Sequence, residues 1–320
     1  MLPQKHQEEP HQTMNLVQEV GRVLDENYVS HTLLHLDSNN ISKHHIITDQ
    51  EKVFVKLLRP DTNPKSLQDE LTFSFRTGYG TNPLLEEIQY RSLSGMRMYL
   101  SAWEWESRYP ISLGMSGIQA VQAARELFRF HSFEKYPELH AVADDQYISY
   151  GEKLTSPSFK YLRAENQTRL RELFNTVIKP NTDLLTVAPE YNVVCHGNAV
   201  PDSLMMRQDY SVFWAGYEHV RSAPREYDLA HMYLHLTQRM RRNDLWQMFQ
   251  QEYENLLGRT VNAYALERFC ALLLSRRALT LASQTLHAAN EDKLSYFLKE
   301  LSPLVKGATV HDVKNFAHLH

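Results

Sequence analysis

The stretch YNVVCHGNAVPDSLMM, residues 191–206, joins an apolar run to a His-Gly pair and an irregular polar segment. The two valines favour a short β-strand, and the glycine and proline that follow indicate that the chain then continues as a loop. Asn198 comes directly after the glycine. Its amide can orient a hydroxyl group through a hydrogen bond, but it cannot accept a proton as a carboxylate does. The stretch therefore predicts a strand that leads into a polar loop, in which an amide and not a carboxylate follows the His-Gly pair.

Length and composition limit the class of protein. The chain has 320 residues, of which 42% are hydrophobic and 22% charged, which is enough for one large domain or two lobes. The formal net charge is −4 and the 34 Lys and Arg are scattered, which argues against nucleic acid as a partner. Only Cys195 and Cys270 occur, so no disulfide framework is expected.

The sequence also bears on the compartment. The N-terminus lacks the apolar core of a signal peptide. The longest apolar run, FCALLL at 269–274, is too short to span a bilayer. We therefore expect a soluble, cytoplasmic protein with no membrane partner.

The first third of the chain predicts a small antiparallel sheet with one helix. Residues 1–30 comprise a polar tail, rich in Gln, His and Pro, and a short amphipathic helix at 15–26. A later helix is predicted from a proline in its first turn and from the spacing of Leu67, Leu71 and Phe75. Segments rich in β-branched or aromatic residues predict strands at 31–36, 43–48, 52–58, 84–90 and 96–105.

From about residue 115 the pattern becomes helical. Helices are predicted at 118–130, 164–178, 225–240 and 265–289. Strands followed by helices indicate an α+β chain with two lobes. The boundary is expected near 105–110, so that residues 31–105 form a small lobe and residues 106–320 a larger helical lobe. The segment 145–161 has no clear period and is interpreted as an insertion or lid.

Four features occur in a fixed order along this chain. Lys56 ends a strand, Glu70 follows on a helix, CHGNAVPDSL follows another strand, and APREYDLA (223–230) opens a helix. This order resembles that of the aminoglycoside phosphotransferase and choline kinase group, which is related to the protein kinases. The resemblance covers roughly residues 30–300. It implies a two-lobed kinase-like fold, with a small antiparallel β lobe, a larger helical lobe and ATP as cofactor.

The resemblance implies nucleotide contacts in the smaller lobe. The lysine and acid that pair in this family match Lys56 and Glu70. Trp103 falls where family members contact adenine. The hairpin that covers the nucleotide matches residues 36–43, which include Ser42 and contain no glycine. If ATP binds, we expect it to lie near these four side chains.

The loop framework of the family is present, but its reactive residues are not. His196 and Asp228 match framework positions, and Asp228 is expected to brace the loop from below. Asn198 stands at the position of the family's catalytic aspartate. Ser203 stands at the position of an asparagine that binds magnesium in the family. Ala215 stands where an aspartate bridges magnesium and the phosphates. Magnesium sites usually include a carboxylate, so magnesium binding is doubtful and a pseudoenzyme is predicted.

Three hypotheses for the function remain open. The first is a pseudoenzyme that binds a nucleotide, a small molecule or a protein partner without efficient phosphoryl transfer. The second is a divergent ATP-dependent small-molecule kinase acting on a hydroxyl group, in which Asp202, Asp209 or Glu218 replaces the missing carboxylates. Candidate metal ligands are then Ser203, Asp202 and Glu218. The third is a protein-interaction scaffold that binds no nucleotide.

Other residues are candidates for an acceptor pocket or for a metal site. The resemblance places the acceptor near four side chains, Tyr217, Glu218, Asp244 and Trp246. His231 and His235 lie four residues apart on a predicted helix, but no acid or cysteine stands beside them at a recognised metal spacing. The run QRMRRN (238–243) is typical of a solvated helix end.

Overall fold

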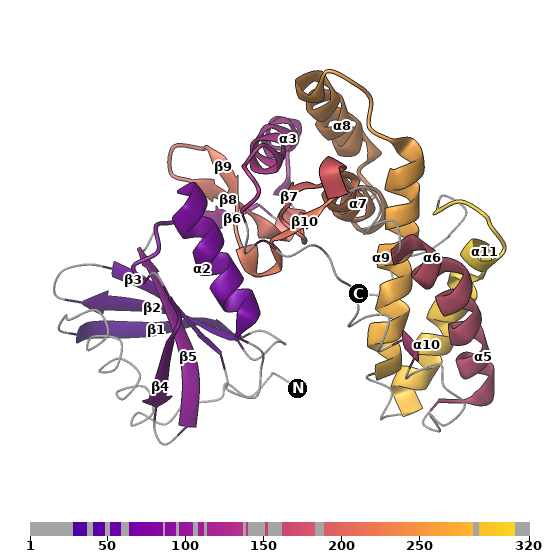
Figure 1. Cartoon of the computed structure of the whole chain (residues 1–320), viewed down its shortest axis with the longest axis horizontal. Helices are drawn as coiled ribbons and strands as arrows, with labels where there is room; N and C mark the ends of the chain where they lie inside the picture. Colours follow the sequence, from indigo (N-terminus) through magenta and orange to yellow (C-terminus); the bar gives the residue numbers. More distant parts are fainter. Residues whose placement is uncertain are drawn as a thin grey trace. The chain divides into compact units, whose positions relative to one another are not determined.

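A computed structural model describes residues 28–36, 41–48, 52–58, 64–85, 87–93, 96–104, 108–111, 114–136, 139, 151–152, 162–182, 189–283 and 288–310 (Figure 1). The predicted helix 15–26, the turn at 37–40 and nearly all of the insertion 145–161 lie outside these residues. So do the side chains of Ser42 and Glu218. Contacts divide the chain into two units, which are described separately: Met1–Tyr109 with Ala215–His219, and Pro110–Trp214 with Val220–His320.

The first unit is built on a five-stranded antiparallel sheet in the order β1-β2-β3-β5-β4 (Figure 1). Its strands are β1 (Tyr28–Leu36), β2 (Ile41–Thr48), β3 (Lys52–Leu58), β4 (Gln89–Leu93) and β5 (Met96–Glu104). The predicted strand 84–90 is wrong, because Leu84 and Leu85 pack against the sheet and β4 begins only at Gln89. The other four predicted strands are confirmed within three residues at each end.

Strand β3 is apolar on both faces because both faces are covered. Successive side chains of a strand point to opposite faces, so the strand divides into two sets. One set packs in a cluster formed by Ile46, Val53, Val55, Leu57, Leu100 and Ala102. The other packs with helix α2 (Lys65–Thr77) in a cluster formed by Phe54, Leu58, Leu67, Leu71 and Trp103. Lys56 lies two residues from both Phe54 and Leu58, so its side chain points to the same face of the strand, which α2 covers.

Helix α2 is followed by Gly78, which caps its C-terminal end. This residue adopts φ 61° and donates its N–H to the carbonyl of Ser74, a common helix ending. The predicted apolar face is wrong at Phe75, which is 58% exposed. At 3.6 residues per turn, Phe75 has rotated by about 80° from Leu67, whereas Ser74 has rotated by only about 20° and is buried.

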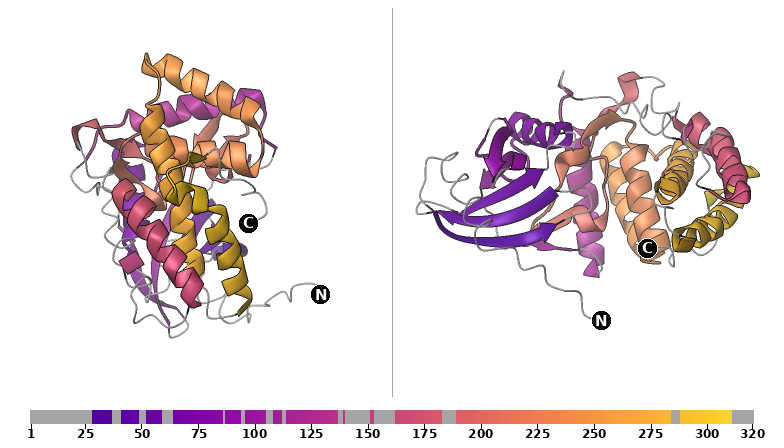
Figure 2. Two further views of the ribbon diagram at one scale, coloured as in Figure 1. Left: turned by 90° about the vertical axis from the view of Figure 1, so that its right-hand side faces the viewer. Right: turned by 90° about the horizontal axis from the view of Figure 1, so that it is seen from below.

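The second unit is mostly helical (Figure 2). Its helices are α3 (Gly117–His131), α5 (Ala164–Leu173), α6 (Lys179–Thr182), α7 (Glu226–Tyr233), α8 (Asn243–Leu257), α9 (Ala263–Ser283), α10 (Ala288–Glu300) and α11 (Ser302–Val305). Strand β7 (Val193–Cys195) pairs with β10 (Arg221–Ala223). A three-stranded sheet contains β6 (Arg108–Pro110), β8 (Leu204–Arg207) and β9 (Val212–Trp214). Short 3-10 helices are η4 (Pro189–Tyr191) and η5 (Pro201–Ser203), and η6 (Tyr217–His219) belongs to the first unit.

Local sequence explains several helix boundaries in this unit. Ser116 and Gln119 form a reciprocal capping box that starts α3 at Gly117, one residue before the predicted start at 118. The predicted helices 164–178 and 225–240 are confirmed in part, because α5 and α7 continue as π-helices η2 (Phe174–Ile178) and η7 (Leu234–Arg239). The predicted single helix 265–289 is wrong: α9 ends at Ser283 and α10 begins at Ala288. Helices α5, α9 and α10 pack around one buried apolar cluster.

Across the described residues, no helix combines the length and the apolar character needed to cross a membrane.

Candidate functional site

Lys56 and Glu70 form a buried ion pair in the first unit. The ammonium Nζ of Lys56 lies 2.6 Å from both carboxylate oxygens of Glu70, and the two residues are 3% and 4% exposed. The same ammonium lies 5.2 Å from the centroid of the Trp103 ring. The structure therefore brings together three of the four residues expected to contact a nucleotide.

Glu70 also holds the segment that contains Ala215. The backbone N–H of Tyr217 donates to Oε1 of Glu70 at 3.3 Å. The Tyr217 ring lies 5.1 Å from the Phe73 ring of α2. Gly80 adopts φ 81°, and a Cβ at this position would overlap the Tyr217 hydroxyl. The segment is thus held close to the ion pair. At its start Ala215 is buried, and its side chain is a methyl group, which cannot bind a metal ion.

In the second unit, Asp228 braces the loop that follows β7. Its carboxylate accepts hydrogen bonds from the backbone N–H of His196 at 2.6 Å and of Gly197 at 2.8 Å. Gly197 adopts φ 80°, a conformation that suits glycine, and allows the chain to turn sharply. The backbone N–H of Asn198 then donates to Nδ1 of His196 at 3.3 Å. The arrangement fixes the position of Asn198 by way of its neighbours.

Two further residues complete this network from helices far away in sequence. Nε2 of His131 lies 3.1 Å from Oδ2 of Asp228, and Nδ1 of His131 lies 2.6 Å from the hydroxyl of Tyr253. Sequence reasoning missed both, because 97 residues separate His131 from Asp228 and 122 separate it from Tyr253. The only signal in the sequence was that a polar residue, His131, directly follows the predicted helix 118–130.

The buried carboxylate of Asp228 is stabilised in its charged form. Burial alone would raise its pKa, but the hydrogen bond and the electrostatic attraction of His131, with smaller contributions from His196 and His231, lower the pKa below 3.8. The contacts with histidine therefore outweigh the effect of burial and favour the charged carboxylate.

This lowered pKa predicts acid sensitivity. Asp228 contributes stability that is fully present above the ordinary pKa of 3.8 and is lost as the pH falls through the lowered folded-state value. We expect the free energy of unfolding of the parent to fall more steeply below pH 3.8 than that of the Asp228→Asn variant. Urea titrations monitored by tryptophan fluorescence at several pH values measure both slopes. If the free energy of unfolding fell equally steeply with pH in both proteins, the lowered pKa of Asp228 would be contradicted.

His131, Cys195 and Asp228 approach one another closely enough to hold a metal ion, with ligand atoms within 4.8 Å. However, a metal needs the thiolate form of cysteine. Burial, together with the charge of Asp228, raises the pKa of the Cys195 thiol well above its usual value. The thiol instead donates to the carbonyl of Ala223 at 3.4 Å. The cluster fits a structural hydrogen-bonded core better than a metal site.

Two of the three candidate replacement acids, Asp202 and Asp209, interact with other residues, and the side chain of Glu218 lies outside the described residues. Asp202 is exposed and forms an ion pair with Arg239 at 2.7 Å. Asp209 is exposed and accepts hydrogen bonds from the backbone and the hydroxyl of Ser211, which lower its pKa. Ser203 lies in η5, where its N–H donates to the carbonyl of Val200 at 2.8 Å. The described contacts of these residues therefore give no sign of a shared metal site.

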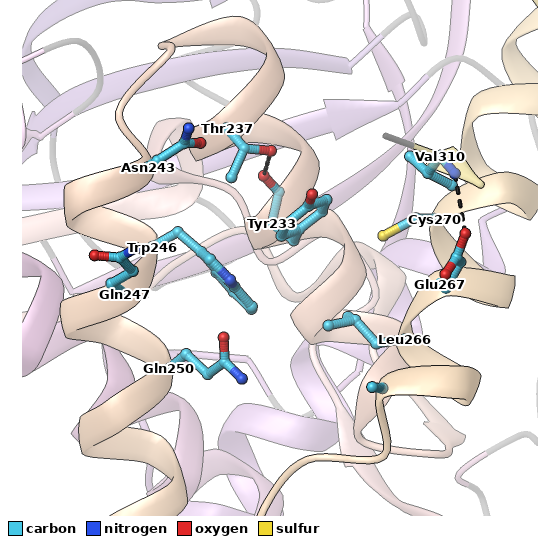
Figure 3. Close-up of a pocket in the computed structure, with 11 residues that line it drawn as sticks. Tyr233, Thr237, Asn243, Trp246, Gln247, Gln250, Leu266, Glu267, Cys270 and Val310 are labelled. Atoms are coloured by element: carbon cyan, nitrogen blue, oxygen red, sulfur yellow. Dashed lines mark hydrogen bonds between the residues drawn. The ribbon is translucent and has the colours of Figure 1, made fainter. Parts of the chain in front are cut away.

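The acceptor candidates divide between the two units. Tyr217 packs within the first unit, and Asp244 pairs with Arg242 on the exposed surface of the second. Trp246 lines a cavity of about 460 Å³ (Figure 3). The cavity lies between α7, η7, α8 and α9, and its polar lining residues include Gln250 and Glu267. The Tyr233 and Trp246 rings meet edge to face, 5.1 Å apart. This cavity offers aromatic, amide and carboxylate groups to a small molecule.

Comparisons with known proteins address the fold. No protein-family model matches the sequence, and no curated protein matches it. Choline kinase LicA from Streptococcus pneumoniae is 15% identical, with a TM-score of 0.63 over 89% of this chain and 97% of LicA. Spectinomycin phosphotransferase APH(9)-Ia is 13% identical, with a TM-score of 0.61 over 93% of this chain and 99% of that one. Plasmodium vivax ethanolamine kinase is 12% identical, with a TM-score of 0.59 over 90% and 84%.

These structures are all of small-molecule kinases, and they cover most of this chain together with most of their own length. The small antiparallel sheet, the helix that carries Glu70 and the mostly helical second unit are consistent with the same architecture. The chain therefore has the two-lobed, kinase-like α+β fold of the choline kinases and aminoglycoside phosphotransferases.

Proposed function

We propose that this protein is a kinase-fold pseudoenzyme, which binds a ligand but does not transfer a phosphoryl group efficiently. The observation that carries the proposal is the loop braced by Asp228. Its framework is complete, with both backbone N–H groups of His196 and Gly197 bonded to the carboxylate. The residue that this framework positions is Asn198, which has no basic group.

The chemical requirements of phosphoryl transfer support this proposal. Transfer to a hydroxyl group needs a residue that accepts or orients its proton, and divalent cations that neutralise the phosphate oxygens. Asn198 can orient the hydroxyl group through a hydrogen bond but cannot accept its proton. Ala215 supplies no ligand for the second, and Asp202, the nearest acid along the loop, is paired with Arg239. Slow or absent turnover follows from these residues together.

Nucleotide is the first ligand to test. The Lys56–Glu70 pair is formed, and Trp103 lies beside it. APH(9)-Ia was crystallised with ADP and spectinomycin and also with AMP, and LicA was crystallised with AMP. We propose that ATP or a related nucleotide binds this protein beside Lys56 without a requirement for magnesium.

Calorimetric titration with ATP in magnesium, in manganese and in a chelator tests this proposal. We expect equal affinity in all three conditions and no release of ADP on prolonged incubation. The Ala215→Asp variant should gain a preference for magnesium, because it adds one carboxylate. A matched control is Asp244→Asn, which changes an exposed acid of the other unit and should leave the titration unchanged.

Other outcomes would favour the alternatives. Magnesium-dependent ATP consumption that is lost in Asp202→Ala would establish a divergent kinase and refute the pseudoenzyme. Absence of binding in all three conditions would refute nucleotide binding, and the ligand would then be another small molecule or a protein.

A further inference from the structure

A second cavity lies beside the loop in the second unit. It has a volume of about 230 Å³, several times the roughly 30 Å³ that one water occupies in the liquid. Val200, two residues after Asn198, contributes one wall. The others come from α7 and η7 and from α9, where Leu273 and Leu274 form an apolar part. The cavity is separate from the one in Figure 3, with which it shares no lining residue.

The lining of this cavity is strongly basic. Arg239 and Arg277 bring two guanidinium groups, and His231 and His235 bring two imidazoles. Among the described residues that line it, none is acidic. The run QRMRRN was expected to be a solvated helix end, and its three arginines are exposed. Arg239 also contributes to the lining of the cavity. The cavity is thus lined for a negatively charged group.

The π-helix η7 explains why three basic residues face the same space. His231, His235 and Arg239 follow one another at intervals of four residues. In a regular α-helix each interval adds a rotation of about 40°, which would carry the third side chain away from the first. In η7 the bonding changes to the wider i to i+5 pattern, seen in the bond from the N–H of Met240 to the carbonyl of His235 at 2.9 Å. The wider turn offsets this rotation, so that the three side chains stay on one side of the helix. Such turns often occur at functional sites.

The two arginines are close enough to affect each other. Burial lowers the pKa of Arg277, and the positive charge of Arg239 lowers it further. Asp202 offsets Arg239 from one side, in a pair whose side chains are 35% and 42% exposed. That pair uses Nη1 of Arg239, and a guanidinium group has further N–H donors that can bind an anion. An oxyanion placed between the guanidinium groups would relieve their repulsion and accept charge-assisted hydrogen bonds from both.

We propose that this cavity binds the oxyanion group, a phosphate or a carboxylate, of a small anionic molecule, and that Arg239 and Arg277 provide the charged contacts. This goes beyond nucleotide binding in the first unit, since it requires neither Lys56 nor ATP. It also distinguishes the two cavities of the second unit. The 230 Å³ cavity selects anions, whereas the charged group lining the 460 Å³ cavity is the carboxylate of Glu267.

The test is titration of the nucleotide-free protein with inorganic phosphate and, separately, with acetate at constant ionic strength. We expect at least one of them to bind and to raise the melting temperature. The response to each identifies whether phosphate or carboxylate is preferred. Arg277→Gln and Arg239→Gln should each weaken binding by about tenfold or more, because each removes a guanidinium contact. Arg129→Gln, at an arginine with a 64% exposed side chain outside the cavity, should bind as the parent does.

Stability of the unliganded variants separates binding from a structural role. The increase in melting temperature that the anion causes, measured from each variant's own unliganded value, should be lost in Arg277→Gln, whereas a purely structural arginine would lower the unliganded value and leave that increase unchanged. Arg277→Lys keeps the charge and should retain part of the affinity. The proposal is overturned if neither anion binds the parent at millimolar concentration, or if the Arg239→Gln/Arg277→Gln double variant binds as tightly as the parent.

Discussion

Asp228→Ala is expected to lower the free energy of unfolding of the second unit by about 3–5 kcal/mol, the range seen when a buried charged partner is removed. The carboxylate is fully buried and bonds to two backbone N–H groups and to His131. Its removal leaves both N–H groups of the loop without their acceptor, in a site from which water is excluded. Urea unfolding followed by the fluorescence of Trp214 and Trp246 measures the loss.

Two further variants make this result specific. Asp228→Asn should be destabilised as well, because its amide can accept one of the two N–H bonds but presents its NH₂ group to the other. Asp244→Ala removes an exposed acid of the same unit, paired only with Arg242 among its described contacts, and should leave the urea midpoint nearly unchanged. If Asp228→Ala and Asp244→Ala had the same midpoint, the bracing role of Asp228 would be wrong.

The Lys56–Glu70 pair predicts the second large effect. Lys56→Met or Glu70→Leu alone should destabilise the first unit by about 3–5 kcal/mol, since each leaves the partner charge buried without its counterion. The double variant replaces both charges by apolar side chains on the face between β3 and α2, next to Phe54 and Leu71. We expect it to recover most of the lost stability, because apolar replacements of buried ion pairs are often neutral.

A double-mutant cycle measures the coupling between the two residues. Recovery will be incomplete to the extent that the N–H of Tyr217 loses its bond to Glu70. If the double variant lost as much stability as the two single variants together, Lys56 and Glu70 would not be energetically coupled. ATP titration of the double variant adds a functional readout, since it should fold but lose the lysine that we propose contacts nucleotide.

Much of the fold could be predicted from the chain because a few motifs occur in a decisive order. Strand 52–58 was predicted with its observed bounds, since its apolar run is flanked by polar turn formers. Lys56, Glu70 and Trp103 come together as expected, and Asp228 reaches the loop after β7. These placements follow from strand alternation and helical spacing combined with the family resemblance.

The remaining features depend on contacts that local pattern does not encode. The partners His131 and Tyr253 approach Asp228 only in the packed unit. The π-helical turn of η7 cannot be distinguished from an α-helix by its apolar period over a few residues, so the sequence does not indicate that Arg239 lines the same cavity as His231 and His235. The separation of α9 from α10 is not marked in the sequence, because residues 282–289 contain neither glycine nor proline.

The contact between Tyr217 and Glu70 also has a consequence for biosynthesis. The two residues are 147 positions apart in sequence, and yet both belong to the first unit. At a ribosomal rate of about 5–20 residues per second, Glu70 is synthesised about 7–30 s before Tyr217. During this interval the aromatic surface of Phe73 and Tyr79 lacks the ring that later packs on it. The nascent sheet and α2 therefore expose an apolar surface for seconds. A chaperone would bind at this surface, and a stalled chain would aggregate through it.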